Sequence, residues 1–249
     1  MKRFLFLLFA LWLPGVLGAA SSLGNARRAQ ALLGPEIWSC VVRVENTAAR
    51  SAYPAVVHAL VFEEAGLLWF YTDFDGTQSL TLHPDRLAEE KADFAPLLRA
   101  IDPGFVTYAI LPDEATDPPV AWRAALPNGC FVESLAALQQ HVRRGERIES
   151  ARLLNCYVDT PAGEHGHTVL TYETPRGLFL LDPGRSPEPQ PMPRAWANDA
   201  LALAGAALQG SRVTRARWVP TALPRPPVTL ASFDFPHDPV PDTAPRLMR

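Results

Sequence analysis

The sequence lacks the basic clusters on which nucleic-acid binding depends. Its 23 lysine and arginine residues are outnumbered by 26 aspartate and glutamate residues, which gives a formal net charge of -3. No group of arginines or lysines stands beside aromatic residues that could stack on bases. Charged residues make up only 20% of the chain against 48% hydrophobic residues, a balance that excludes a disordered chain. We therefore expect a folded protein that does not bind nucleic acid.

A hydrophobic run long enough to span a membrane is also missing. The longest apolar stretch begins at Phe4 and is interrupted at Pro14, well short of the roughly 20 residues that a membrane-spanning helix needs. Two basic residues precede this stretch and small residues follow it at 18–20, which is the order found in secretory signal peptides. We expect residues 1–20 to be a cleaved signal peptide, and the mature protein to be periplasmic or secreted with no stable membrane span.

Proline, in contrast, is abundant, and its distribution divides the chain. Of the 25 prolines, 13 lie at or after Pro183, and residues 220–249 are so rich in proline that they predict an extended tail. An acidic, proline-bearing connector at 112–119 marks the best internal boundary. These features predict a β-rich N-terminal segment over 21–118, a core over 119–219 and a tail over 220–249.

The N-terminal segment has the pattern of a small sheet with short helices. β-branched and aromatic residues predict strands at 41–45, 56–63, 67–72 and 105–111. The second and third strands flank the turn residues Ala65 and Gly66 and therefore predict a hairpin. Helical spacing of apolar residues predicts a helix between Leu87 and Ile101, with a break at Pro96. The stretch 21–35 is expected to be a linker or a short helix.

The core segment alternates helices with strands. Apolar Leu135, Leu138 and Val142 predict an amphipathic helix over 131–144, which Gly145 ends. Strands are predicted at 151–158, 167–173, 178–182 and 213–219, with an alanine-rich helix over 195–209. The expected fold class is α+β: an antiparallel sheet with a helix that carries a candidate nucleophile at its N-terminus, preceded by the β-rich segment and followed by the proline-rich extended C-terminus.

The candidate nucleophile is Cys130, which stands immediately before this helix. Unpaired backbone N–H groups and the helix dipole favour an anion there, so the position lowers the pKa of a cysteine thiol. His167 begins one predicted strand and Asp182 ends the next, so hairpin pairing brings these two side chains together. A carboxylate that orients a histidine beside a thiol is the arrangement that activates a cysteine nucleophile. A buried structural cysteine is the alternative reading of Cys130.

The order of these motifs resembles the transglutaminase-like branch of the papain-like cysteine peptidase superfamily. Gly129-Cys130 resembles the nucleophile motif, Gly166-His167-Thr168-Val169 the base and Leu180-Leu181-Asp182-Pro183 the third member of the triad. The resemblance covers about residues 122–187 and implies a papain-like or transglutaminase-like core with a catalytic Cys130, His167 and Asp182. It implies no cofactor.

One feature departs from the papain-like pattern, because no glutamine lies several residues before Cys130 to donate to the oxyanion. Trp122, Asn128 and the Cys130 backbone N–H are the candidate replacements. His165 is the alternative base. His167 is the preferred one, because the strand pattern begins after it and Gly166 marks the end of the preceding loop. A metal site formed by Glu164, His165 and the next histidine lacks a further ligand at a recognisable spacing, so we expect no metal.

Three cysteines cannot all pair within one chain, so at least one thiol is free. A disulfide between Cys40 and Cys156 would leave Cys130 free, as a thiol enzyme outside the cytoplasm requires. A buried, unpaired Cys156 is an equally good interpretation, and a Cys130 to Cys156 bridge would abolish the catalytic one.

The segment Asp73-Phe74-Asp75-Gly76-Thr77 matches the nucleophile motif of haloacid-dehalogenase-like phosphatases. That family also has a later lysine and an acidic loop, and no matching acidic loop follows here. The alternative is a plain turn between two strands, as Asp-Gly pairs commonly form. We favour the turn.

The sequence as a whole predicts an exported thiol hydrolase or acyl transferase that acts on peptide or amide bonds in a peptide, a protein or the cell wall. Two other functions remain open at this stage. One is a non-catalytic periplasmic binding or assembly protein that retains the fold, and the other is the phosphatase.

Overall fold

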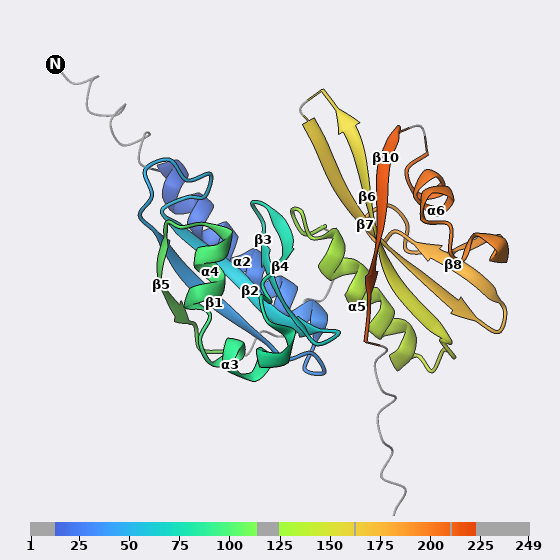
Figure 1. The fold of residues 1–249 in the computed structure, drawn as a ribbon, viewed down its shortest axis with the longest axis horizontal. Coiled ribbons are helices and arrows are strands. Elements are labelled where there is room, and N and C mark those ends of the chain that lie inside the picture. The colour runs from blue at the N-terminus through green and yellow to red at the C-terminus, as the bar shows by residue number, and fades with distance from the viewer. Residues whose placement is uncertain (1–12, 114–124, 162, 210, 223–249) are drawn as a thin grey trace, which may run out of the picture.

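The computed structural model describes residues 13–113, 125–161, 163–209 and 211–222. They form two antiparallel sheets of five strands each, with helices on both sides and between them (Figure 1). The first sheet has the order β4-β3-β2-β1-β5 and consists of β1 (Ser39–Asn46), β2 (Val56–Glu64), β3 (Leu67–Thr72), β4 (Gly76–Ser79) and β5 (Phe105–Ile110). The second has the order β10-β6-β7-β8-β9 and consists of β6 (Ser150–Thr160), β7 (Gly163–Thr174), β8 (Gly177–Leu181), β9 (Gln190–Met192) and β10 (Val213–Pro220). The α+β class expected from the sequence is confirmed.

The helices divide the interior into three hydrophobic layers. α3 (Leu87–Ala92) and α4 (Ala95–Ile101) cover the outer face of the first sheet, and α6 (Ala200–Ala207) covers the outer face of the second. α2 (Leu13–Leu33) and α5 (Cys130–Arg143) lie in the central layer, with α5 between the two sheets (Figure 1). Two 3₁₀ turns complete the described elements, at Pro84–Arg86 and Arg194–Trp196.

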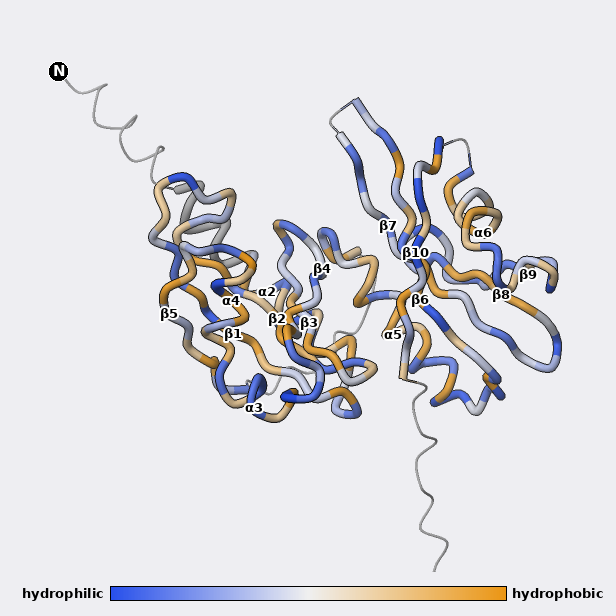
Figure 2. The backbone as a smooth tube through the Cα atoms, in the orientation of Figure 1, coloured by the Kyte–Doolittle hydropathy of each residue, from blue (hydrophilic) through white to orange (hydrophobic). Residues whose placement is uncertain are grey.

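Because side chains alternate along a strand, each strand contributes hydrophobic residues to both faces of its sheet. On β1, Val41 points into the central layer, whereas Val42 and Val44 point toward α4. On β6, Leu153 faces the centre and Leu154 packs beneath α6. Figure 2 shows the resulting hydrophobic stretches along β2, β3 and α5.

The central layer joins the two sheets through α5. Phe131, at the start of this helix, lies with its ring centroid 4.6 Å from that of Trp69 on β3. Farther along, Leu135 and Leu138 belong to the same cluster as Leu170 and Tyr172 of β7. The boundary predicted at 118/119 falls outside the described residues, but the elements on either side of it share one core.

Most predicted elements are present with small shifts in their ends. The hairpin turn at Ala65 and Gly66 is confirmed, because both residues have positive φ angles of 52° and 75° as a two-residue hairpin turn requires. The region 21–35, expected as a linker or a short helix, is helical as far as Leu33, where it forms the second part of the longer helix α2. Its Ala26, Ala29 and Leu33 are fully or almost fully buried. Its low helix amphipathicity and small side chains gave little sign of this burial.

Two further differences concern the second sheet. β7 begins at Gly163 rather than at His167. Pairing with β6 extends the strand through Gly163 and Gly166, where the sequence predicts a loop. The helix predicted over 195–209 is shorter, and β9 went unpredicted because its Gln190-Pro191-Met192 has no strand pattern. The proline-rich tail after Ala222 and the first part of the predicted signal peptide lie outside the described residues. Among the helices that the structure describes, none has the length and hydrophobicity required to cross a membrane.

Candidate active site

Cys130 is the first residue of α5, at the end of a tight loop. Asn128 adopts a positive φ of 52°, and the Gly129 backbone N–H donates to the Leu126 carbonyl at 3.0 Å. A Cβ atom at residue 129 would lie 2.2 Å from the Leu126 Cβ, so only glycine fits there. The loop thus delivers the thiol to a helix N-terminus, where the first backbone N–H groups have no intrahelical acceptor.

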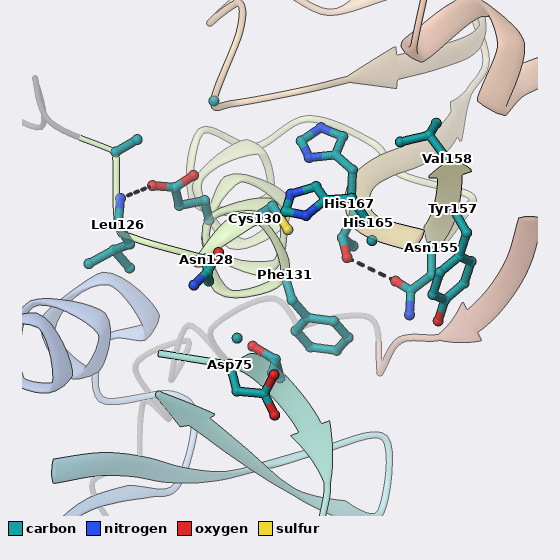
Figure 3. Close-up of a pocket in the computed structure, with 18 of the residues that line it drawn as sticks. Asp75, Leu126, Asn128, Cys130, Phe131, Asn155, Tyr157, Val158, His165 and His167 are labelled. Carbon is teal, nitrogen blue, oxygen red and sulfur yellow. Dashed lines mark hydrogen bonds between the residues drawn. The ribbon is translucent and has the colours of Figure 1, made fainter. Parts of the chain in front are cut away.

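His167 and Asp182 come from the neighbouring strands β7 and β8. Leu181, the last residue of β8, pairs with Leu170, so Asp182 follows at the strand end and reaches back toward the histidine. The His167 Nε2 atom lies 2.8 Å from Asp182 Oδ2. With Nε2 occupied in this way, Nδ1 remains for the thiol, and Figure 3 shows the imidazole beside the Cys130 sulfur. The three residues expected to form a triad are therefore brought together.

The surroundings of Cys130 and His167 favour the charged forms of both side chains. Burial by itself would raise the pKa of Cys130, but the hydrogen bond and charge of His167, together with hydrogen bonds from Thr168, lower this pKa below its ordinary value. Burial would likewise lower the pKa of His167, but hydrogen bonds with Asp182 and Cys130 raise it to about 9. Because each group favours the charged form of the other, the site is arranged for a thiolate and an imidazolium.

Thr168 is a contributor to the site that sequence reasoning missed. A hydrogen bond from its backbone N–H helps to lower the pKa of the Cys130 thiol. The Thr168 hydroxyl donates to Asn155 Oδ1 at 2.9 Å, and Ser134 of α5 donates to the Thr168 carbonyl at 3.2 Å. A polar residue directly after the histidine was the available signal, but its contact with sulfur depends on where α5 lies.

Asn128 has a different role from the oxyanion donor that was expected. Its side-chain Nδ2 donates to the backbone carbonyls of Asp73 and Phe74, at 2.9 and 3.0 Å. Tyr71 adds a hydrogen bond from its hydroxyl to the Pro127 carbonyl at 2.9 Å. The β3–β4 hairpin therefore braces the loop that carries Cys130. Trp122, the other side-chain candidate for the oxyanion, lies outside the described residues. The backbone N–H of Cys130, the first residue of α5, remains a candidate donor, since the first N–H groups of a helix have no intrahelical acceptor.

The brace can be tested with two substitutions of Asn128. Asn128→Asp keeps the side-chain shape but sets a carboxylate oxygen against two carbonyl oxygens, so we expect it to lower the free energy of unfolding by about 1 to 2 kcal/mol. Asn128→Gly permits the positive φ and loses only the hydrogen bonds, with an expected cost of about 1 kcal/mol or less. Urea denaturation of the two variants measures the difference. A fully stable Asn128→Asp variant would contradict the brace.

The hairpin also accounts for the phosphatase-like segment. Asp73-Phe74-Asp75 forms the turn between β3 and β4, as the preferred interpretation predicted. The Asp73 carboxylate accepts a hydrogen bond from Asn25 at 2.9 Å, and Asp75 accepts one from the Tyr53 hydroxyl at 2.8 Å. Lys91, the one lysine that follows this segment in the sequence, is ion-paired with Glu63 at 2.7 Å instead of lying beside these aspartates.

His165 lies two residues before His167 on the same strand, and its side chain is exposed. It lines the cleft, but the hydrogen bond with Asp182 belongs to His167. Across the ranges that the structure covers, no three His, Cys, Asp or Glu side chains are grouped so as to hold a metal ion.

All three cysteines are free, so of the two interpretations of Cys40 and Cys156 the structure shows unpaired thiols and not the disulfide. Cys40 lies on β1 and packs against the outer layer of the first sheet, whereas Cys156 lies on β6 beneath α6. The two side chains therefore belong to hydrophobic layers on opposite sides of the molecule. Burial raises the pKa of Cys40 to about 11 and, with the charges of Asp182 and Cys130, that of Cys156 to about 12.

Cys130 and His167 line a cleft of about 860 Å³ between the two halves of the molecule. One wall comes from the β3–β4 hairpin at 74–77, and the other from β6 and β7, including Tyr157 and Gly166 (Figure 3). The nucleophile loop with Cys130 lies between these walls. The cleft is large enough for several residues of a peptide, and it reaches the sulfur directly.

Comparisons of the chain with protein-family models, with curated proteins and with solved structures find no match.

Proposed function

We propose that this protein is a thiol hydrolase or acyl transferase acting on peptide or amide bonds, with Cys130 as nucleophile, His167 as acid and base, and Asp182 as the residue that orients His167. The observation that carries the proposal is the convergence of these three side chains from separate segments, with His167 held at 2.8 Å by Asp182 and its imidazole beside the Cys130 sulfur (Figure 3). We place its core in the transglutaminase-like branch of the papain-like superfamily. A cysteine at a helix N-terminus that faces a histidine on an antiparallel sheet supports this placement.

The proposed reaction begins with attack of the Cys130 thiolate on the substrate carbonyl carbon. The carbonyl oxygen takes the electron pair and becomes an oxyanion, which the Cys130 backbone N–H stabilises. The imidazolium of His167 then protonates the leaving amine as the C–N bond breaks, which leaves a thioester. Water or a second amine attacks the thioester while His167 removes its proton, and the Cys130 thiolate is released.

Labelling with iodoacetamide across a range of pH tests the proposal. We expect alkylation at pH 7 to be confined to Cys130, because the pKa of Cys40 is about 11 and that of Cys156 about 12. The rate at Cys130 should follow a titration well below the ordinary thiol pKa. Mass spectrometry of the labelled peptides assigns the site, and Cys130→Ala is the control. A Cys130 that titrates like a free thiol, or that stays inert, would refute the proposed function.

The location of the enzyme is part of the same proposal. The order of residues 1–20 supports export, and a periplasmic or secreted enzyme would meet peptides or cell-wall amides as substrates. Cleavage near residue 20 would leave the buried second part of α2 in the mature chain.

A further inference from the structure

One edge of β7 is unpaired where it passes the candidate triad. β7 pairs with β6 along Gly163–Glu173 but with β8 only along Leu170–Thr174. Beyond Leu181 the chain turns away, so no described strand pairs with residues 163–169 on the β8 side of β7. We call this unpaired position beside β7 the vacant lane. The vacant lane borders the cleft.

The direction of the backbone groups along β7 follows from two contacts. The Glu149 N–H donates to the Glu173 carbonyl at 2.8 Å on the β6 side, so odd-numbered residues direct their N–H and C=O groups toward β6. Thr168 directs its N–H to the Cys130 sulfur and its carbonyl to Ser134, away from β6. Even-numbered residues therefore present their backbone to the vacant lane, and the next two are Gly166 and Glu164.

Gly166 is the best placed of these residues to receive a ligand. By the alternation above, its backbone N–H and C=O point away from β6. Among the described residues, no turn, loop or side-chain hydrogen bond to either group is found. The position is exposed, and a Cβ there would approach nothing closer than the Tyr157 ring at 3.6 Å. Cys130 closes the lane two residues farther on, at Thr168, so a strand lying against Gly166 would lead directly to the sulfur.

We propose that the substrate is an extended peptide that adds a parallel strand to the free edge of β7. One peptide carbonyl accepts from the Gly166 N–H, and the peptide N–H two residues farther along donates to the Gly166 carbonyl. Backbone pairing of this kind gives affinity without requiring a particular side chain. In this register the carbonyl of the residue that donates to Gly166 lies beside Thr168, at the Cys130 sulfur. The inference rests on the proposed function, because Cys130 must be the attacking group for this register to matter.

The test compares two alkylating reagents with related reactive groups. The rate of alkylation by chloroacetamide depends on the Cys130 thiolate alone. The chloromethyl ketone of N-acetyl-trialanine also carries a peptide backbone, so its rate depends on backbone pairing as well. For the peptide reagent, the three amide nitrogens are methylated one at a time. Because only alternate residues of a strand face the partner, we expect a loss of about tenfold or more at alternate nitrogens and little change at the one between. Equal effects at all three nitrogens, or none, would overturn the edge pairing.

Two variants of Gly166 give an independent measurement. Gly166→Pro removes the N–H that faces the vacant lane and costs no bond with β6, so the sheet should be retained. We expect it to slow the peptide reagent about tenfold while chloroacetamide reacts as in the native protein. The control Gly166→Ala retains the N–H and should stay within about twofold for both reagents. Equal behaviour of the Pro and Ala variants toward the peptide reagent would overturn the proposal.

The same reagents separate the two proposals. A Cys130 that is inert toward both refutes the proposed function and this inference with it. A Cys130 that reacts readily with chloroacetamide, but for which the native protein shows no dependence on amide methylation, refutes the edge pairing alone.

Discussion

Replacing His167 by alanine should move the alkylation of Cys130 to a pH above 9 and lower its rate at pH 7 by about tenfold. Without His167, burial remains and raises the thiol pKa, so roughly 1% or less of Cys130 would be ionised at pH 7. A thiolate of higher pKa is intrinsically more nucleophilic, which offsets about tenfold of that loss. Hydrolysis or acyl transfer should fall farther, by about 10³-fold or more, because the leaving amine also loses its proton donor.

The matched control is His165→Ala, which removes an exposed imidazole from the same strand, two residues away. It should leave the pH dependence of alkylation unchanged. Rates of iodoacetamide alkylation, measured between pH 5 and 10 for both variants, show which histidine lowers the pKa of the Cys130 thiol. Equal profiles for His167→Ala and His165→Ala would contradict the assignment of the base.

Replacing Asp182 by asparagine should narrow the pH range in which the proposed enzyme works. The raised pKa of His167 keeps the imidazolium up to about pH 9, and the Asp182 carboxylate is the largest of the contributions that raise it. In Asp182→Asn the pKa of His167 falls, so the basic limb of the pH profile moves to lower pH. We expect activity at pH 8 to fall by about 10² to 10⁴-fold, because the imidazole also loses the partner that fixes its tautomer.

Stability should respond to the same substitution with a definite sign. The pKa of His167 is raised from 6.5 to about 9 in the folded protein, so its protonation stabilises the fold fully below pH 6.5 and progressively less up to pH 9. The difference in unfolding free energy between the native protein and Asp182→Asn should therefore shrink between pH 6.5 and 9. Asp85→Asn, which makes the same change at an exposed turn, is the control. A difference that grows with pH would contradict the pairing.

The triad could be predicted from the sequence because its geometry depends on local pairing. A tight turn at Arg176 joins the two strands, so His167 and Asp182 must end near each other whatever surrounds them. The position of Cys130 before an amphipathic helix was equally visible, since the apolar spacing of α5 defines both its start and its buried face.

The parts that could not be predicted depend on contacts between distant segments. Asn128 looked free to donate to an oxyanion, but its partners are backbone carbonyls 54 and 55 residues earlier in the chain. Cys40 and Cys156 both looked like buried strand residues, and nothing in the alternation revealed that they face different layers. Small side chains concealed the burial of α2, because hydrophobic periodicity is weak where alanine does the packing.

The shared central layer has a consequence for how the protein unfolds. Phe131 packs on Trp69 of the first sheet, and the loop that precedes it is hydrogen-bonded to the β3–β4 hairpin. Loss of the first sheet would therefore expose one side of α5 and release the loop that holds Cys130. The two halves should melt in a single cooperative transition, and a fragment that contains only the second sheet should retain the triad residues without the means to keep them in place.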